Sequence, residues 1–464
     1  MVSYISERVP ALAGAAHFAE IEAADPRRIA ALQEERLRRQ YAYLWQHSAF
    51  YRRKFARAGL DPQSVRSVAD LVEVPFTTKQ ELRDSLQAAP PFGEHLAAPI
   101  GSVIQMQASS GTTGSPSYVA LTRHDAYVWQ ESSARSLYAC GIRPGDLVLH
   151  GFSMSKGFVG GLPIFQAIQY MGAVDIPIGA DGGVDRLLAA AFDLKPAAIV
   201  GTPNFLAYLA EAALATRGRS VREIGVCRLV VGGEPGGGIP AVRERLQELW
   251  HAKSCELMGG TDLAVIYWAE CDEQDGMHMT APDFILVELI DPDTDQVLPM
   301  RDGAKGELVY TALNREASPV FRFRSGDHVV VTGTTCRCGR TQPKIRCFGR
   351  TDDMLIVRGV NLFPSAVQDI VESLRPRAAG IMRILADFDG HSTQDNLRVL
   401  VERGAQAAPG DDDALRETVA LRIRNALSVK ADVRIVPYES FERPGATKVK
   451  LVLREAPAGL EEGR

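Results

Sequence analysis

The sequence has few cysteines and no disulfide pattern: its 464 residues contain seven, an odd number, at scattered positions. It has no apolar run of about 18 residues, and its N-terminus lacks the basic and then apolar segment of a secretion signal. Its formal net charge is −5, so it offers no excess of basic residues to a nucleic acid. These absences argue against a disulfide-stapled, a membrane-spanning and a nucleic-acid-binding protein, and they favour the cytoplasm.

The sequence also lacks the Gly-Lys-Ser/Thr ending of the common phosphate-binding loop. It has instead a run at 108–118, ASSGTTGSPSY, that is rich in glycine and hydroxyl side chains. Glycine lets the backbone approach an anion, and successive backbone N–H groups and hydroxyls can surround a phosphate. Such a loop without its own lysine predicts a nucleotide that reacts at its α-phosphate, with the cation supplied from elsewhere. The alternative is a surface loop of serine and glycine. The predicted phosphate-binding residues are Ser109, Ser110, Gly111, Thr112, Thr113 and Gly114.

Apolar and helical patterns predict the fold class. Between residues 100 and 270, short apolar runs alternate with segments of helical spacing, which is typical of a parallel, doubly wound sheet. The stretch 284–331 is rich in strand-forming residues and predicts a smaller flanking sheet. Residues 26–58 have the spacing of one amphipathic helix. The pattern beyond residue 350 is that of a compact α+β unit.

A chain of this length exceeds what one hydrophobic core usually supports, so we expect more than one domain. The sequence predicts an α/β protein with a large N-terminal domain at 1–348 and a small, mobile α+β domain at 354–464. The polar residues 349–353 connect the two patterns and are the expected hinge.

Several blocks along the chain resemble one known family. The run 108–118 resembles the phosphate loop of the adenylate-forming superfamily, and the other blocks narrow the resemblance to the phenylacetate–CoA ligase family. They keep that family's order over residues 45–452. The blocks are FYRRKF at 50–55, VPFTTK at 74–79, LTRHD at 121–125, FRSGD at 323–327, GRTDDM at 349–354 and GVNLFP at 359–364.

The resemblance implies roles for residues around a nucleotide. Asp327 is expected to bind the ribose, because a carboxylate can accept both ribose hydroxyls. Gly233 and Glu234 follow a predicted strand at 229–231, where ligands of open α/β sheets bind, and correspond to the adenine site. An ordinary turn is the alternative for each of these positions.

The run 256–262, ELMGGTD, corresponds to Tyr-Gly-Leu-Ser/Thr-Glu in the family. The resemblance implies that Met258 lies against the adenine, that Gly259 belongs to the nucleotide site, that Thr261 contacts the α-phosphate and that Asp262 holds Mg²⁺. Met258 replaces the aromatic residue and can cover the adenine only without ring stacking. Asp262 replaces the longer glutamate and shortens the reach to the metal by one methylene.

Two further elements concern the C-terminal part. The family rotates its small domain between two half-reactions, and Asp352 corresponds to the hinge, with Arg350 reaching the nucleotide. The family's catalytic lysine corresponds to Lys448 when the segment is aligned on Val452, and Lys450 competes for the role. An alignment on Gly445 would place Ala446 there and remove the lysine. A mobile ammonium would stabilise the negative charge that develops at the α-phosphorus.

Two other sets of residues are candidates for binding a metal ion and the acid substrate. Cys271, His278, Cys336 and Cys338 offer three sulfur ligands and one nitrogen ligand, which suit tetrahedral zinc. The alternative is reduced thiols without metal. The other cysteines, Cys140, Cys227, Cys255 and Cys347, stand in apolar contexts and are expected in the core.

A loop after the predicted strand 147–149 falls where relatives bind the acid. It would form a flat apolar slot that fits an aryl ring, although loop packing explains each residue equally well. The predicted acid-binding residues are Phe152, Met154, Phe158 and Gly161.

Together these features predict an ATP-dependent ligase that joins a carboxylic acid, expected to be aromatic, to CoA through an acyl-AMP intermediate. The expected cofactors are ATP, Mg²⁺, CoA and a structural Zn²⁺. One alternative is an acid-activating enzyme that loads a carrier protein or an amine, and another is a non-catalytic nucleotide sensor. Partners other than the small substrates are not expected, except for that carrier protein and a second copy in a homodimer.

Overall fold

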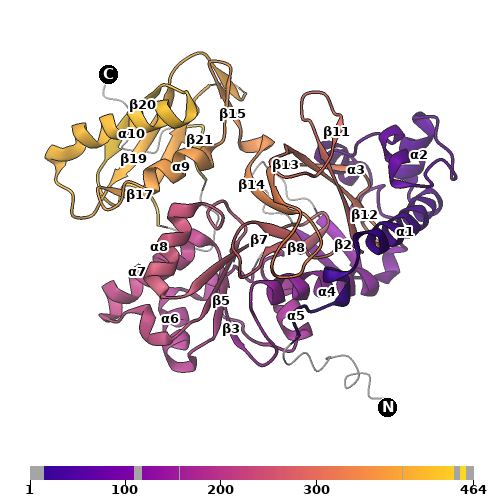
Figure 1. Cartoon of the computed structure of the whole chain (residues 1–464), viewed down its shortest axis with the longest axis horizontal. Coiled ribbons are helices and arrows are strands. Elements are labelled where there is room, and N and C mark those ends of the chain that lie inside the picture. The colour runs from indigo at the N-terminus through magenta and orange to yellow at the C-terminus, as the bar shows by residue number, and fades with distance from the viewer. Residues whose placement is uncertain (1–14, 109–117, 156, 389, 444–449, 456–464) are drawn as a thin grey trace.

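The computed structural model describes residues 15–108, 118–155, 157–388, 390–443 and 450–455 (Figure 1). It has an α/β architecture around one sheet of twelve strands, in the order β11-β10-β12-β13-β14-β9-β8-β7-β6-β5-β3-β4, with three smaller sheets. The predicted fold class is therefore confirmed.

Five neighbouring strands of the large sheet are parallel, as the alternating pattern predicts. The strands are β3 (Leu147–His150), β4 (Val174–Ile176), β5 (Ala198–Gly201), β6 (Arg228–Gly232) and β7 (Lys253–Gly260). The central strands β3, β5 and β6 are short, mostly apolar and largely buried runs, which is typical of parallel sheets, whereas β4 and β7 also carry polar residues.

Helices cover both faces of these strands. Val148 and Val200 pack in the cluster that includes α4 (Arg123–Ala139) and α5 (Leu162–Tyr170). Leu149 and Ile199, their neighbours in the strands, face the opposite cluster. That cluster includes α6 (Val184–Leu194), α7 (Pro203–Arg217) and α8 (Pro240–Trp250). Alternate residues of each strand thus point to opposite layers, which makes the sheet doubly wound.

The remaining strands of the large sheet are antiparallel. Residues 284–331, expected to form a smaller flanking sheet, instead continue the large sheet. The connection is made because β8 pairs with β7 and β9 pairs with β14. These strands are β8 (Ala264–Glu270), β9 (Met277–Met279), β10 (Ile285–Ile290), β11 (Val297–Leu298), β12 (Lys305–Ala312), β13 (Phe323–Gly333) and β14 (Lys344–Arg350).

The N-terminal part is helical. The single helix expected at 26–58 is two helices, α1 (Pro26–His47) and α2 (Ala49–Arg57). Ser48 has extended dihedrals, and its hydroxyl accepts a hydrogen bond from the Tyr51 backbone, so it caps the second helix. After α3 (Lys79–Ala88), strands β1 (Val103–Ala108) and β2 (Tyr118–Thr122) pair on either side of the predicted phosphate loop.

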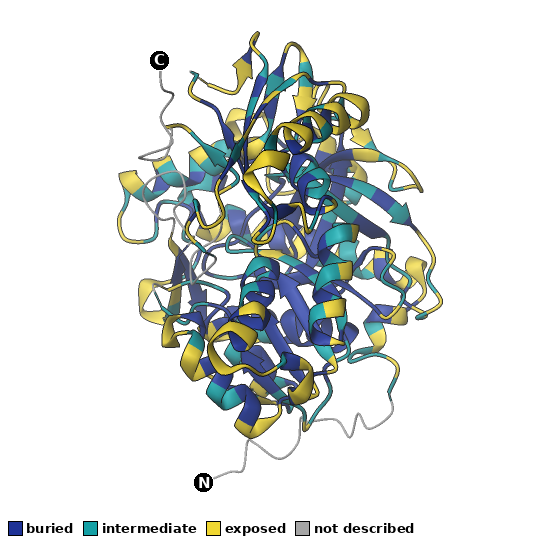
Figure 2. Cartoon of the chain, turned by 90° about the vertical axis from the view of Figure 1, so that its left-hand side faces the viewer, coloured by how far each residue is buried: buried dark blue, intermediate teal, exposed yellow. Residues whose placement is uncertain are grey.

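Residues beyond 350 form a separate core cluster that extends from Leu355 to Val433. Its elements are β15 (Leu355–Val357), β16 (Val360–Leu362), α9 (Pro364–Glu372), β17 (Ala378–Leu385), β18 (Ser392–Thr393), β19 (Leu397–Arg403), α10 (Asp412–Leu427), β20 (Ala431–Val436) and β21 (Val452–Leu453). Figure 2 shows buried strands at the centre of the molecule and exposed outer faces on its helices. None of the described helices combines the length and apolar character needed to cross a bilayer.

A buried carboxylate joins distant parts of the large sheet. Asp125, in the first turn of α4, is fully buried and accepts hydrogen bonds from the backbone of Glu316 (2.7 Å) and Ala317 (2.8 Å) and from Arg315 Nε (3.1 Å). Arg315 also donates through Nη1 to the carbonyl of Leu263. Asp125 and Arg315, which we call the Asp125 hub, therefore connect α4, the segment before β13 and the turn between β7 and β8.

We expect Asp125→Ala to lower the free energy of unfolding by about 3 kcal/mol or more, because it leaves the buried Arg315 without its carboxylate. Thermal and urea unfolding would measure the loss. The matched control is Glu35→Ala, which removes an exposed ion pair with Arg39 on α1 and should cost less than about 1 kcal/mol. A loss at Asp125 no larger than that of the control would contradict the role of the hub.

Candidate active site

The structure does not describe every predicted site residue. The residues outside the described ranges are Ser109, Ser110, Gly111, Thr112, Thr113, Gly114 and Lys448. Asp352 lies in a short 3-10 helix, Thr351–Asp353, and its side chain is also outside the description. The roles of these residues stay predictions.

The reversal between β7 and β8 determines where Thr261 and Asp262 lie. The backbone of Gly259 approaches the partner strand so closely that a Cβ there would lie 1.8 Å from the Val265 carbonyl oxygen. Only glycine fits, so the chain can turn back at once and place Thr261 and Asp262 in the turn at the end of β7. Met258, one residue earlier, packs partly buried against the central core cluster.

Asp262 stands among positive charges. Burial raises the pKa of its carboxyl, and the neighbouring charges of Lys79, Arg350 and Arg315 act in the opposite direction. Lys79 begins α3 and belongs to the VPFTTK block, but the sequence alone gave it no place in the site. Its charge is the first of those that lower the pKa of Asp262.

Asp327 and Arg350 meet across neighbouring strands. The two residues are paired in the register of β13 and β14, and Arg350 Nη1 lies 3.2 Å from Asp327 Oδ1. Arg350 also donates to the Ser325 carbonyl at 2.9 Å. Asp327 is only 8% exposed, and its ion pair with Arg350 compensates for the burial of the carboxylate. The pair can hold a carboxylate oxygen ready to accept hydrogen bonds from a sugar.

Tyr267 is a buried tyrosine on which the charges of Asp327, Asp262 and Arg350 act, and the sequence did not predict it as a site residue. The pKa of Tyr267 is raised mainly by burial and then by the charge of Asp327, while Asp262 and Arg350 also act on it. Its ring meets that of Tyr310 edge-on, with centroids 5.3 Å apart. A Cβ at Gly260 would lie 3.4 Å from the Tyr267 hydroxyl, so this side chain lies beside the turn that carries Asp262. Only the tertiary fold brings it there, since it lies inside an apolar strand.

The loop after β6 lies at the carboxyl end of the parallel strands. Gly233 has a φ of +83°, and Glu234 Oε1 accepts a hydrogen bond from the Asn204 backbone at 3.1 Å. Further along this loop, a Cβ at Gly238 would lie 2.5 Å from Glu256 Oε2. Burial and the charge of Glu270 raise the pKa of Glu256 to about 7.

The predicted acid-binding loop is fixed at both ends. His150 Nδ1 lies 3.1 Å from Asp175 Oδ1 and its Nε2 lies 2.9 Å from the Gly160 carbonyl oxygen. Asp181 accepts hydrogen bonds from the backbone of Met154 (2.8 Å) and Ser155 (3.1 Å). A loop held in this way can present a rigid surface to a ligand.

The four predicted acid-binding residues differ in their exposure. Phe152 is only 3% exposed and packs in the core, and Gly161 is also buried. Met154 and Phe158 are partly exposed. Phe158 pairs with Ala108, the residue directly before the predicted phosphate loop. Met154 and Phe158 thus have side-chain surface left for a ligand, and Phe158 connects their loop to the nucleotide side.

The predicted metal ligands come together. One ligand atom from each of Cys271, His278, Cys336 and Cys338 lies within 4.8 Å of the others. The Sγ atoms of Cys271 and Cys336 are 3.7 Å apart, and Cys338 Sγ lies 3.5 Å from His278 Nε2. Hydrogen bonds from Cys271 and His278 hold the pKa of the Cys338 thiol well below its usual value. The pKa values of the Cys271 and Cys336 thiols are raised, so the cluster offers one thiolate, two thiols and an imidazole.

The other cysteines are not all in the core. None of the seven forms a disulfide, and Cys140 and Cys255 are buried, as predicted. Cys347 is only partly buried, and Cys227 is exposed, so the prediction is wrong for Cys227. Cys227 precedes β6, where the chain is still at the surface.

Three comparisons with known proteins were informative. Residues 359–454 match the family described as AMP-binding enzyme C-terminal domain. The phenylacetate–coenzyme A ligase of Thermus thermophilus is 35% identical over 450 residues, which cover 94% of this chain and 98% of that protein. A structure of 2-hydroxyisobutyryl-CoA ligase in the postadenylation state matches with a TM-score of 0.86 and 30% identity, over 94% of this chain and 91% of the other. The same ligase with 2-HIB-AMP and CoA in the thioesterification state matches with a TM-score of 0.69 and 31% identity, over 93% and 91% of the two chains.

The raised pKa of Glu256 predicts a pH-dependent stability. Its folded-state pKa lies above the ordinary value of 4.5, so its contribution is complete below pH 4.5 and is lost as the pH rises through about 7. Glu256→Gln, which has no charge to bury, should therefore be more stable than the wild type at pH 8, by on the order of 1 kcal/mol after allowing for partial exposure, and similar to it at pH 5.

Melting temperatures at pH 5 and pH 8 would check this prediction. Glu248→Gln, on the exposed face of α8, is the control for removing a glutamate charge. A loss of stability at pH 8 in the Glu256→Gln variant would show that the ionised carboxylate is well solvated or well paired.

Proposed function

The chain belongs to the phenylacetate–CoA ligase family, and from this premise we propose that it joins an aromatic carboxylic acid to CoA at the expense of ATP. The observation that carries the proposal is the 35% identity over nearly the whole length of both chains. It is supported by the meeting of Asp262, Asp327 and Arg350 from distant segments at one edge of the sheet. The aromatic character rests on Met154 and Phe158 in the fixed loop.

The reaction has two steps. First a carboxylate oxygen of the acid bonds to the α-phosphorus of ATP and the bond to pyrophosphate breaks, which gives acyl-AMP. Then the CoA sulfur bonds to the acyl carbon, loses its proton, and AMP leaves. In this proposal Asp327, oriented by Arg350, binds the ribose, the 233–234 loop and Met258 border the adenine, and Thr261 contacts the α-phosphate. The hard carboxylate oxygens of Asp262 fit Mg²⁺, which would neutralise phosphate charge when bound.

We also propose that residues 349–353 separate a large domain from a small C-terminal domain, with Asp352 as the hinge. The difference between TM-scores of 0.86 and 0.69 for two states of one relative supports this, because two rigid parts in another mutual arrangement lower the overall match. The separate core cluster beyond residue 350 also favours it.

The cluster of Cys271, His278, Cys336 and Cys338 is proposed to hold one structural zinc. Three soft sulfur atoms and an imidazole nitrogen within 4.8 Å of one another suit a tetrahedral site. Bound metal would tie the end of β8 to β9 and to the loop after β13. Such reduced thiols also favour the cytoplasm as the place of the protein.

The function is tested by incubating the protein with ATP, Mg²⁺ and a panel of aryl and alkyl acids that begins with phenylacetate. Acid-dependent release of pyrophosphate, followed by a thioester when free CoA is added, is the expected result. Pyrophosphate release without thioester formation would point to another acyl acceptor. No release with any acid would overturn the proposal.

Lys448 is expected to serve the first step only, by stabilising charge at the α-phosphorus. Lys448→Ala should slow acid-dependent pyrophosphate release by about two orders of magnitude or more, and it should spare thioester formation from supplied acyl-AMP. The matched control is Lys450→Ala, since Lys450 is exposed and close in sequence. A larger effect at Lys450 would move the catalytic role to that residue.

Metal analysis of protein purified without added zinc should find about one zinc per chain, as one tetrahedral site requires. Cys338→Ser should lower both the zinc content and the melting temperature, because a ligand is lost. Cys227→Ser is the control, since Cys227 is an exposed cysteine away from the cluster. Metal-free wild-type protein of full stability would contradict the assignment.

A further inference from the structure

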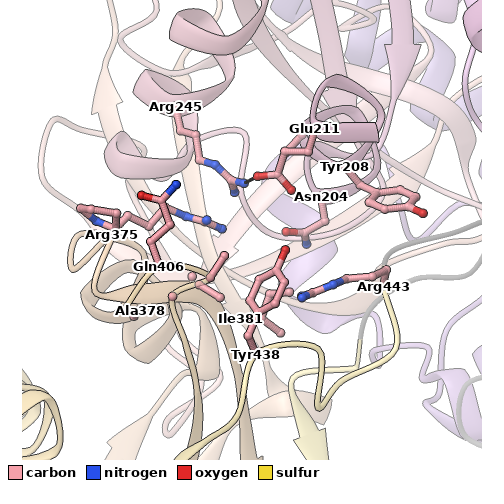
Figure 3. Close-up of a pocket in the computed structure, with 16 residues that line it drawn as sticks. Asn204, Tyr208, Glu211, Arg245, Arg375, Ala378, Ile381, Gln406, Tyr438 and Arg443 are labelled. Atoms are coloured by element: carbon pink, nitrogen blue, oxygen red, sulfur yellow. Dashed lines mark hydrogen bonds and ion pairs between the residues drawn. The ribbon is translucent and has the colours of Figure 1, made fainter. Parts of the chain in front are cut away.

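Polar side chains of α8 and α9 bring the C-terminal part into contact with the helices of the large sheet. Figure 3 shows the cleft beside this contact, with Arg245 and Glu211 on the side of the large sheet and Arg375, Gln406 and Tyr438 on the C-terminal side. The cleft has a volume of about 320 Å³. Among the described residues, no buried hydrophobic cluster contains members from both sides.

Glu372, at the end of α9, is the centre of this contact. Its side chain is only 4% exposed, and its Oε1 lies 2.9 Å from Arg245 Nη1 of α8 and 2.9 Å from Arg375 Nε. Arg245 also pairs with Glu211 of α7. One buried carboxylate thus shares two guanidinium groups, of which only Arg245 belongs to the opposite side.

The backbone is shaped for this ion pair. Gly380 has a φ of +74°, and a Cβ there would lie 1.7 Å from Glu372 Oε2 and 2.4 Å from Arg375 Nη2. A larger residue would expel the carboxylate from its place. One turn earlier on α9, Asp369 lies near the start of α8, where the backbone N–H of Ala241 lowers the pKa of its carboxyl while burial raises it. Two carboxylates at positions i and i+3 therefore face the same helix.

A second contact lies close to the connection. The Phe363 ring packs edge-on against Phe348, with centroids 5.1 Å apart, and a Cβ at Gly349 would lie 2.0 Å from Phe363 Cδ1. Ser365 donates to the Phe348 carbonyl at 2.6 Å. This contact adjoins residues 349–353 in sequence, whereas the contact of Glu372 with Arg245 lies farther along the chain and depends on the mutual arrangement of the two parts.

We propose that Arg245 and Glu372 are positioning residues for the adenylation half-reaction, because their ion pair holds α9 against α8 in the arrangement that matches the postadenylation relative. The inference rests on the proposed ligase function. A change of arrangement must break the Arg245–Glu372 pair. Glu372 would keep Arg375 and Arg245 would keep Glu211, so neither charge is left alone after release. The Arg245–Glu372 ion pair therefore stabilises the arrangement for adenylation without preventing the arrangement for thioester formation.

The test measures the two half-reactions separately in full-length protein, with the best acid of the panel. Glu372→Gln keeps the shape of the side chain and removes its charge. We expect acid-dependent pyrophosphate release to fall about tenfold, and thioester formation from supplied acyl-AMP and CoA to stay at or above the wild-type rate. Arg245→Met should give the same split, and Arg245→Lys should restore most of the first half-reaction.

The matched control is Asp412→Asn, which removes an ion pair with Arg403 (Nε to Oδ1, 2.7 Å) inside the C-terminal part. It should leave the ratio of the two half-reactions unchanged. In small-angle X-ray scattering with ATP, the wild type and this control should show the arrangement in which α9 contacts α8. The Glu372→Gln variant should depart from that arrangement.

The outcomes separate the two proposals. A wild type that releases no pyrophosphate with any acid would overturn the proposed function. An active wild type whose Glu372→Gln and Arg245→Met variants keep the wild-type ratio would overturn only the positioning role. An equal loss in both half-reactions, with a lower melting temperature and no rescue by Arg245→Lys, would also overturn it, because it would indicate general destabilisation.

Discussion

The candidate site depends on the close approach of the Gly259 backbone to the carbonyl of Val265. This approach lets β7, the last parallel strand, turn directly into the antiparallel β8, so that the ladder continues without a break. The parallel half brings the loop after β6 to its carboxyl end, and the antiparallel half pairs Asp327 with Arg350, whose charge acts on Asp262. A side chain at Gly259 would separate the strands directly before the turn that carries Thr261 and Asp262.

Buried charged side chains stabilise the turn between β7 and β8. Asp125 fixes Arg315, Arg315 donates to the carbonyl of Leu263, and Leu263 is the neighbour of Asp262. A carboxylate buried in a core is costly unless it is paired, and here the pairing also determines the position of a residue in the site. Asp262 in turn feels the charges of Lys79 and Arg350, which come from the start of α3 and from β14. The site is therefore an assembly of distant segments whose charges balance one another.

This explains what the sequence could and could not predict. The strands at 147–149, 198–200 and 229–231 were predictable, because parallel strands buried on both faces are continuous apolar runs. The break at Ser48 was not, since a serine within a helical pattern reveals its capping role only when the second helix packs. Lys79 and Tyr267 were missed for a similar reason: one lies at a helix start and the other in an apolar strand, and only the tertiary fold brings both beside Asp262. The clustering of Cys271, His278, Cys336 and Cys338 was predictable because thiol and imidazole side chains are distinctive at any spacing.

The contact between the two parts of the chain follows a different principle from the cores. Hydrophobic burial would hold α9 on α8 strongly, and separating the helices would expose apolar surface to water. Carboxylates and guanidinium groups lose less when they separate, because water solvates each of them again and part of their pairing remains within each side. An interface of Glu372, Asp369 and Arg245 can therefore select one arrangement by a small free energy. A chain that must complete two reactions at one site needs such a preference to be weak enough to reverse in every cycle.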